Sequence, residues 1–113
     1  MDCIFCKIAD GSIPANVVYE NETVIAFRDL QPQAPDHILI IPKKHIPTMN
    51  DFALDDGAAF AAMGAAAREV AKAIGVAEQG YRLVINCNEQ GGQTVFHTHM
   101  HFLAGRQMTW PPG

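Results

Sequence analysis

The chain has 113 residues, of which 49% are hydrophobic and 18% charged, and its formal net charge is −4. This length predicts one domain, residues 1–113, with a single core, and an acidic chain without a basic stripe is not a general nucleic-acid binder. The longest run of small and apolar residues, AAFAAMGAAA, is too short and too close to charged residues to span a membrane. No signal-peptide pattern opens the sequence, so we expect a cytoplasmic protein.

The first half of the chain predicts a short helix followed by three strands. Residues 3–10 have helical character and Gly11 ends them, and β-branched and aromatic residues predict a hairpin from 16–20 and 23–29. The two prolines of QPQAP predict a loop before the apolar strand 37–43.

The second half predicts one long helix and two further strands. Residues 55–74 carry an apolar stripe at helical spacing, formed by Phe60, Met63, Ala67, Val70 and Ile74. Strands follow at 81–87 and 95–104, separated by a glycine-rich turn at 88–93. This order of elements favours an α+β fold with an antiparallel sheet over an alternating βαβ fold.

Three histidines occupy every second position of FHTHMHFL. If this stretch is a strand, His97, His99 and His101 share one face, about 7 Å apart from one to the next. At that spacing all three cannot reach one metal ion, although a His-x-His pair can chelate zinc. An exposed polar face is the plain alternative, but histidine is scarce in this chain. A nucleophilic or phosphate-binding row remains open.

A glycine-rich segment directly precedes the histidines. Gly91 and Gly92 allow backbone N–H groups to approach an anion closely, and Asn86, Gln93 and Thr94 add neutral hydrogen-bonding groups. An ordinary hairpin turn would have the same glycines. Next to three histidines, the segment favours a phosphate site.

Cysteines indicate a possible second site. Cys3 and Cys6 form a Cys-x-x-Cys pair, and the segment PKKH supplies His45, so one more ligand would complete a tetrahedral zinc site. Two partly buried thiols and a surface histidine are the alternative. Cys87 has no partner by spacing and is expected to be a buried strand thiol.

The pattern HTHMHFL fits His-φ-His-φ-His-φ-φ, where φ is apolar and Thr98 is a departure. On this pattern the chain resembles the histidine triad (HIT) family, and its Hint branch in particular. Other blocks of the chain agree with the resemblance, which covers essentially residues 3–113: IFCKIADGSIPA, AFRDLQPQAPDHILIIPKKHI, GGQTVFHTHMH and GRQMTWPPG.

The resemblance implies a HIT-like α+β fold with about five antiparallel strands, one long and one short helix, and two protomers that form a continuous sheet in a homodimer. It implies a hydrolase of purine nucleoside phosphoramidates that needs no cofactor for catalysis. His99 would attack phosphorus and form a nucleotidyl-histidine intermediate, which water then hydrolyses. His101 would bind the phosphoryl oxygens, and His97 and His37 would orient and tune the nucleophile.

The family pattern also implies residues that bind the nucleotide and residues that bind a structural zinc ion. Asp29 would accept hydrogen bonds from the ribose hydroxyls. The apolar slot for the base would be formed by Ile4, Phe5, Ile8, Phe27 and Leu30. The phosphate or the leaving group would contact Asn86, Gly92, Gln93, Thr94, His99 and His101. The zinc ligands would be Cys3, Cys6, His45 and His97.

Three rival functions remain to be weighed. A dinucleoside polyphosphate hydrolase belongs to another branch of the family, and the ending WPPG speaks against it. A non-catalytic nucleotide-binding or zinc-binding module would not need a nucleophile at His99. A metallohydrolase built on His-x-His would lack a nearby acid, since the nearest one before the stretch is Glu89. The resemblance also places Trp110 near the partner subunit's site, whereas packing on its own domain is the alternative.

Overall fold

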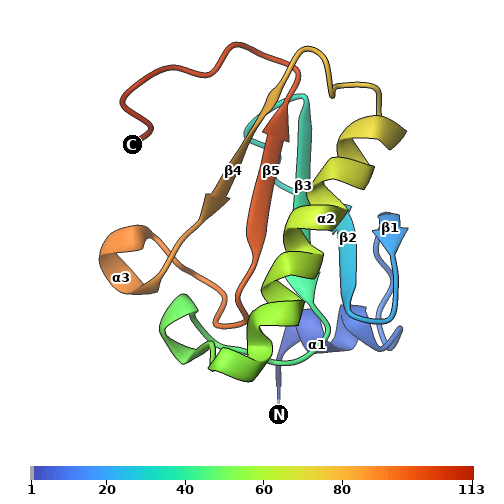
Figure 1. Ribbon diagram of the computed structural model, residues 1–113, viewed down its shortest axis with the longest axis vertical. Helices are drawn as coiled ribbons and strands as arrows, with labels where there is room; N and C mark the ends of the chain where they lie inside the picture. The colour runs from blue at the N-terminus through green and yellow to red at the C-terminus, as the bar shows by residue number, and fades with distance from the viewer. Residues whose placement is uncertain (1) are drawn as a thin grey trace.

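The structure is a computed structural model that describes residues 2–113. Five antiparallel strands form one sheet in the order β1-β2-β3-β5-β4, as Figure 1 shows. The strands are β1 (Val17–Glu20), β2 (Val24–Arg28), β3 (Asp36–Pro42), β4 (Tyr81–Ile85) and β5 (Met100–Ala104). The helices are α1 (Ile4–Ala9), α2 (Gly57–Ala73) and α3 (Asn88–Gly91), with 3-10 turns at Met49–Asp51 and Leu54–Asp56. The predicted α+β fold is confirmed.

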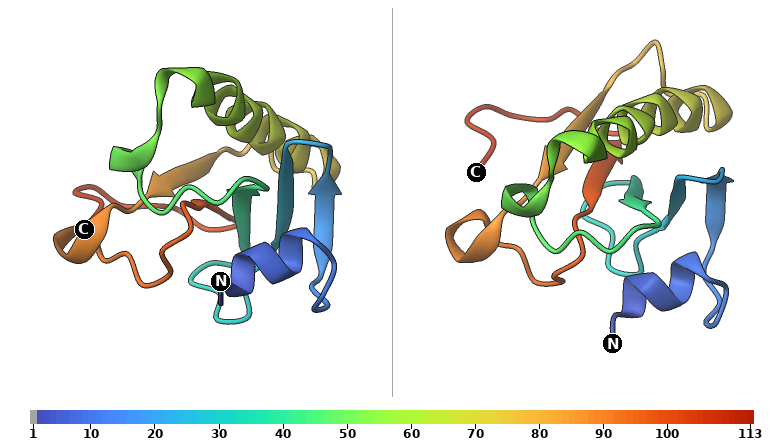
Figure 2. Two further views of the ribbon diagram at one scale, coloured as in Figure 1. Left: turned by 90° about the horizontal axis from the view of Figure 1, so that it is seen from below. Right: turned by 60° about the horizontal axis from the view of Figure 1, so that its bottom comes forward.

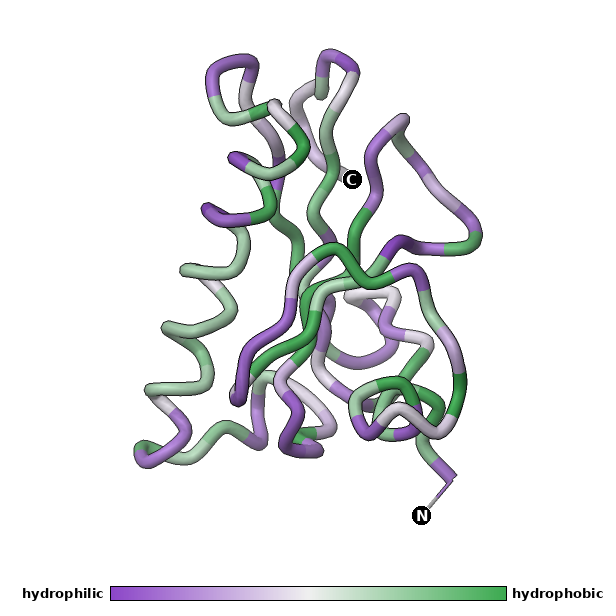
Figure 3. The backbone as a smooth tube through the Cα atoms, turned by 90° about the vertical axis from the view of Figure 1, so that its right-hand side faces the viewer, coloured by the Kyte–Doolittle hydropathy of each residue, from purple (hydrophilic) through white to green (hydrophobic). Residues whose placement is uncertain are grey.

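Helix α2 packs against one face of the sheet, and α1 lies toward the other face (Figure 2). Side chains alternate along a strand, so Ile38 and Ile40 of β3 and Phe102 of β5 point toward α2 and form the main core with it. Figure 3 shows hydrophobic residues concentrated along the strands and hydrophilic ones mostly in the peripheral loops. No helix within residues 2–113 is long and apolar enough to cross a bilayer.

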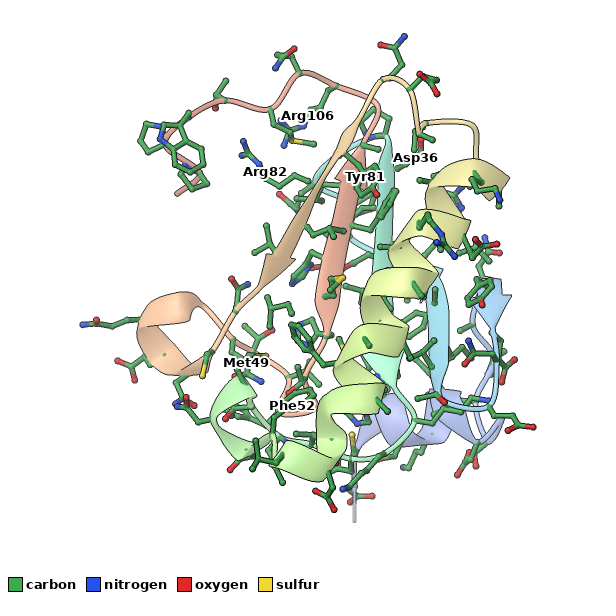
Figure 4. The ribbon with its side chains drawn as sticks, viewed as in Figure 1. Asp36, Met49, Phe52, Tyr81, Arg82 and Arg106 are labelled. Atoms are coloured by element: carbon green, nitrogen blue, oxygen red, sulfur yellow. The ribbon has the colours of Figure 1, made fainter. Side chains whose placement is uncertain are left out.

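The apolar stripe predicted for the long helix is buried in its middle. Met63, Ala67 and Val70 are buried against the sheet, whereas the ring of Phe60 is 42% exposed. Phe60 instead meets Phe52 edge-on, with ring centroids 5.8 Å apart. This contact lies at the beginning of α2, where Figure 4 labels Phe52. The stripe therefore overestimates how far the core extends along the helix.

The opposite face of the sheet carries a smaller core beneath α1. Phe5 of α1 packs on Phe27 of β2, with ring centroids 5.6 Å apart, and Leu39 and Ile41 of β3 complete the layer. In the register of β3 with β5, Leu39 lies opposite His101. This face therefore brings α1, the middle of the sheet and the histidine segment together.

The prediction of a strand over residues 95–104 is wrong in its first half, because β5 begins only at Met100. The backbone N–H of Thr98 donates to the carbonyl of Ile46 at 2.7 Å instead of joining the sheet ladder. The expected turn at 88–93 contains the short helix α3, which ends at Gly92 with a φ of 83°. His97 and His99 consequently lie before the strand, although the ring centroids of His99 and His101 are still 4.9 Å apart.

Thr98 also provides a test of packing at this departure from the family pattern. Its side chain is 1% exposed, and Oγ1 has no hydrogen-bond partner. Because a buried hydroxyl without a partner is costly, Thr98→Val should raise the free energy of unfolding by about 1 kcal/mol. Urea denaturation measures the change.

A matched control for Thr98 is Thr48, another buried threonine. The Thr48 hydroxyl accepts from the N–H of Asn50 and donates to Asp51. Thr48→Val should therefore lower the free energy of unfolding by about 1 kcal/mol, the opposite sign. Destabilisation by both substitutions would show that the Thr98 hydroxyl contributes a favourable interaction.

Candidate active site

A cavity of about 530 Å³ opens between α1, β2 and the histidine segment. It has an apolar wall on one side and polar side chains at its edge. Its lining is formed by Ile4, Phe5, Ile8, Pro14, Ala15, Asn16, Phe27, Arg28, Asp29, Leu30, Gln31, Leu39, Thr94, Val95, His99 and His101. A volume of this size is typical of small-ligand sites.

His99 lines this cavity and is held in a defined tautomer. Its ring is 6% exposed, and Nδ1 lies 2.8 Å from the backbone carbonyl oxygen of His97. A carbonyl oxygen can only accept, which assigns the proton to Nδ1 and leaves a lone pair on Nε2. Phe5 stands edge-on to the ring, with centroids 5.2 Å apart. His99 can therefore act as a nucleophile through Nε2.

His37 and His101 form a pair beside His99. The backbone N–H of Gln33 donates to Nδ1 of His37 at 3.0 Å, which leaves the His37 proton on Nε2. That Nε2 lies 2.9 Å from Nδ1 of His101. Nδ1 of His101 thus accepts, and neutral His101 carries its own proton on Nε2. Such an N–H group can donate to an anionic oxygen of a ligand in the cavity.

The two paired imidazoles are kept neutral by their surroundings. Burial lowers the pKa of His101 to about 4, helped by the nearby His99 and His37 and opposed by Asp29. Burial also lowers the pKa of His37, again against the attraction of Asp29, whose Oδ2 lies 3.6 Å from Nε2. At neutral pH the pair is a chain of hydrogen bonds without a net charge.

The lowered pKa of His101 predicts a pH dependence of stability. Its ordinary value is 6.5, so between pH 6.5 and about 4 the unfolded chain binds a proton at this residue that the folded chain does not. The free energy of unfolding should therefore fall as the pH decreases through this window, by roughly 1 kcal/mol per pH unit. Urea titrations from pH 7.5 to 4 measure the slope. His101→Asn should reduce the slope and leave the part that comes from His37, whose pKa burial also lowers, and an unchanged slope would exclude His101 as a source.

The side chain of His97 belongs to a different cluster. Its Nε2 lies 2.7 Å from the carbonyl oxygen of Pro42, which assigns the proton there and leaves Nδ1 as a ligand atom. Nδ1 lies 3.4 Å from Sγ of Cys3 and 3.6 Å from Sγ of Cys6. Sγ of Cys6 is in turn 3.3 Å from Nδ1 of His45.

These four residues fit a tetrahedral zinc ion. Their ligand atoms all lie within 4.8 Å of one another. In a tetrahedral site with ordinary Zn–S and Zn–N bonds, sulfur and nitrogen ligands are about 3.6 Å apart, close to the separations found here. Two thiols and two imidazoles are also a donor set that zinc prefers. Burial, together with Cys3, raises the pKa of the Cys6 thiol, and metal binding would deprotonate it.

Asp29, His37 and His101 also bring possible ligand atoms within 4.8 Å of one another. Their geometry is explained without an ion, because His37 and His101 bond to each other directly and His37 Nδ1 is taken by Gln33. The arrangement is that of a hydrogen-bonded pair rather than a set of converging ligands.

The structure does not bring every predicted site residue to the cavity. Asn86, Gly92 and Gln93 are absent from its lining. The Gln93 side chain is 6% exposed; it accepts from the N–H of Asn88 and donates to the carbonyls of Pro47 and Val95. The Gln93 side chain thus holds the segment before the histidines in place. Its neighbour Thr94 lines the cavity.

Some residues at the site were not anticipated from the sequence. Leu39 and Val95 line the cavity but look like ordinary apolar strand residues. Only the pairing register shows that Leu39 lies opposite His101. Gln33 contacts His37 through its backbone, which no side-chain pattern reveals.

The protein is an α+β protein with a five-stranded antiparallel sheet and a cavity edged by oriented imidazoles. A family model described as HIT domain matches residues 10–108. The chain belongs to this family, as its resemblance to histidine triad proteins predicted.

Relatives with solved structures or curated names agree. The chain is 49% identical over 107 residues to the purine nucleoside phosphoramidase of Escherichia coli (strain K12), covering 95% of this chain and 90% of the relative. A HIT family hydrolase from Legionella pneumophila Philadelphia 1 superposes with a TM-score of 0.96 at 58% identity, covering 99% and 100% of the two chains. A histidine triad protein from Clostridium difficile gives 0.94 at 44% identity, covering 96% and 95%. These relatives indicate a hydrolase.

Proposed function

We propose that the protein hydrolyses purine nucleoside phosphoramidates to a nucleoside monophosphate and an amine. The observation that carries this proposal is the tautomer of His99, whose Nδ1–H is held by the carbonyl of His97 so that Nε2 keeps its lone pair at the cavity. The curated name of the Escherichia coli relative supports the same substrate class. Turnover of adenosine 5′-phosphoramidate by the wild type and by His99→Ala tests it.

The reaction takes place in two displacements at phosphorus. Nε2 of His99 gives its electron pair to the α-phosphorus, the P–N bond breaks, and the amine takes the bonding pair and a proton from the solvated end of the site. Water then attacks the nucleotidyl-histidine, loses a proton, and returns the electron pair to Nε2. Neutral His101 donates from Nε2–H to a phosphoryl oxygen in both steps, and His37 holds it in that tautomer.

Other lining residues bind the nucleotide. We assign the base to the apolar wall formed by Ile4, Phe5, Ile8, Phe27 and Leu30. Asp29 accepts from the ribose hydroxyls, and Thr94 contacts the phosphate or the leaving group. Gln93 acts from outside the cavity lining by holding the segment that carries Thr94, and we keep Asn86 and Gly92 as residues that contact the phosphate or the leaving group.

The cluster of Cys3, Cys6, His45 and His97 binds a structural zinc ion in this proposal. The ion would tie α1 to the segments that follow β3 and precede β5. Its chemistry is structural, because the His97 side chain does not line the cavity. His97 acts on catalysis through its backbone carbonyl, which orients His99.

We further propose a homodimer that joins two sheets along β4. This strand is an edge of the sheet, and its Tyr81 and Leu83 side chains are 38% and 41% exposed. The unpaired N–H and C=O groups of an exposed apolar edge strand can pair with a strand of another chain. Trp110 is 82% exposed and does not pack on its own domain, and the C-terminal segment runs outward past β4 (Figure 1). It can thus reach the partner subunit's site.

The proposal also includes the domain organisation of the chain and its location in the cell. Residues 1–113 act as one HIT domain, of which the family model covers 10–108. The three cysteines are free, as expected of a cytoplasmic protein in a reducing compartment.

A dinucleoside polyphosphate hydrolase is the main rival, since the same His99 could attack a phosphoanhydride. The name of the Escherichia coli relative favours the phosphoramidate. A non-catalytic nucleotide-binding or zinc-binding module is a weaker rival, because nucleotide binding alone does not require the oriented lone pair of His99.

A further inference from the structure

A chain of hydrogen bonds connects the C-terminal segment to the paired histidines. The guanidinium of Arg106 donates from Nε at 3.2 Å and from Nη2 at 3.0 Å to the backbone carbonyl oxygen of Gln33. The N–H of the same residue donates to Nδ1 of His37 at 3.0 Å. Nε2 of His37 then meets Nδ1 of His101 at 2.9 Å. Arg106 thus lies three links from a residue that lines the cavity.

The turn that follows β5 directs Arg106 to this position. Ala104 ends β5 opposite Asp36, and Gly105 adopts a φ of 96°. A Cβ atom on Gly105 would lie 2.8 Å from Cβ of Pro35. The chain can therefore turn closely over the loop at residues 31–35 only with glycine here, and this turn places Arg106 beside Gln33.

The charge of Arg106 is not used in an ion pair. Among residues 2–113, every lysine and arginine other than Arg82 and Arg106 pairs with a carboxylate. Figure 4 shows these two arginines near each other, beside the C-terminal segment. Both donate to backbone carbonyls, Arg82 to Thr109 and Arg106 to Gln33 and Gln107. A two-pronged bond from a charged donor to Gln33 holds the loop more firmly than a neutral bond would.

Without the bond from Arg106 to the Gln33 carbonyl, the loop would shift and the N–H of Gln33 would move away from His37. The direction of the whole hydrogen-bond chain would then change. His37 is 4% exposed, so without the Gln33 N–H its buried Nδ1 would lose its donor. The ring would then favour the tautomer with the proton on Nδ1, which makes Nε2 an acceptor. His101 would have to place its proton on Nδ1 to meet it. That tautomer has no Nε2–H for a phosphoryl oxygen.

We propose that Arg106 is a positioning residue for the proposed hydrolysis. Arg106 holds the 31–35 loop, so that His37 and His101 keep the tautomers that bind the reacting phosphoryl group. The inference rests on the proposed function of the same site. It acts within one chain, from the C-terminal segment to the cavity of that chain.

Steady-state kinetics with adenosine 5′-phosphoramidate provide the first test. Arg106→Met should lower kcat about tenfold with KM little changed, because a charge-assisted bond is lost while the base and ribose contacts remain. Arg106→Lys, which keeps a charged donor, should recover part of the loss. Arg68→Met is the control: it removes an exposed arginine of α2 that pairs with its neighbour Glu69 and contacts neither the loop nor the C-terminal segment, and it should leave kcat within about twofold.

A double-mutant cycle shows whether Arg106 acts through His37. In a His37→Ala background, Arg106→Met should have no further effect on kcat, because the residue it positions is gone. Independent losses that multiply would overturn the proposal, as would an unchanged kcat in Arg106→Met.

A spectroscopic readout separates this inference from the proposed function. Imidazole ¹⁵N shifts at neutral pH should show His37 protonated on Nε2 in the wild type and in Arg68→Met, and mixed tautomers in Arg106→Met. If the wild type turns over no phosphoramidate, the proposed function fails, while the shifts still decide whether Arg106 sets the tautomer. Identical His37 shifts in all three proteins would overturn the inference.

Discussion

Replacement of His99 by alanine is expected to lower kcat for adenosine 5′-phosphoramidate by at least about 10⁴-fold, because in the proposed mechanism it removes the atom that attacks phosphorus and forms the covalent intermediate. The cavity wall and Asp29 remain, so AMP should still bind. Single-turnover experiments analysed by mass spectrometry should find a nucleotidyl adduct on the wild type and none on His99→Ala. AMP titration checks that the variant keeps its site.

A graded comparison strengthens this test. His101→Asn keeps the nucleophile and loses the ring donor to the phosphoryl group, so we expect a loss of about 10²-fold, well short of the loss in His99→Ala. Substantial turnover by His99→Ala would rule out the covalent mechanism. Faster hydrolysis of a diadenosine polyphosphate than of the phosphoramidate by the wild type would favour the rival substrate class.

Removal of zinc is expected to destabilise the protein while leaving the chemistry of the folded protein intact. Cys3, Cys6, His45 and His97 come from three separate segments, and a shared ion would link them. Cys6→Ser should lower the free energy of unfolding by about 3 kcal/mol and Tm by about 10 °C or more. Thermal unfolding with and without a chelator measures the same effect in the wild type, and kcat at a temperature where the protein stays folded should change little.

Cys87 provides the control for the zinc prediction. It is a free, half-buried thiol outside the cluster, so Cys87→Ser should retain the metal and the chelator response. Metal analysis of protein purified without added zinc should find about one equivalent in the wild type and in Cys87→Ser but not in Cys6→Ser. A wild type without metal and without a chelator response would reject the site. If chelation abolished turnover while the protein stayed folded, the result would favour the rival function of a metallohydrolase.

Much of the fold is predictable from local patterns. Strands β2 and β3 are short apolar runs between turn residues, and the 55–74 stripe anticipates α2, because period and residue type reflect which side of an element is buried. The limits of such patterns appear at β5. An alternation of histidines resembles a strand, but the backbone N–H of Thr98 donates to Ile46 in the segment after β3, and sequence periodicity carries no information about that partner.

The sequence by itself determined the family, the α+β class and the residue types of both candidate sites, because motif spacing and hydrophobic periodicity are local properties of the chain. Only the tertiary structure decided how each of these histidines is oriented and which ring nitrogen carries its proton. The carbonyl of Pro42 turns His97 toward the cysteines, the carbonyl of His97 leaves the Nε2 lone pair of His99 at the cavity, and His37 sets the tautomer of His101. An imidazole has two nitrogens with interchangeable roles, and contacts between segments far apart in the chain choose between them.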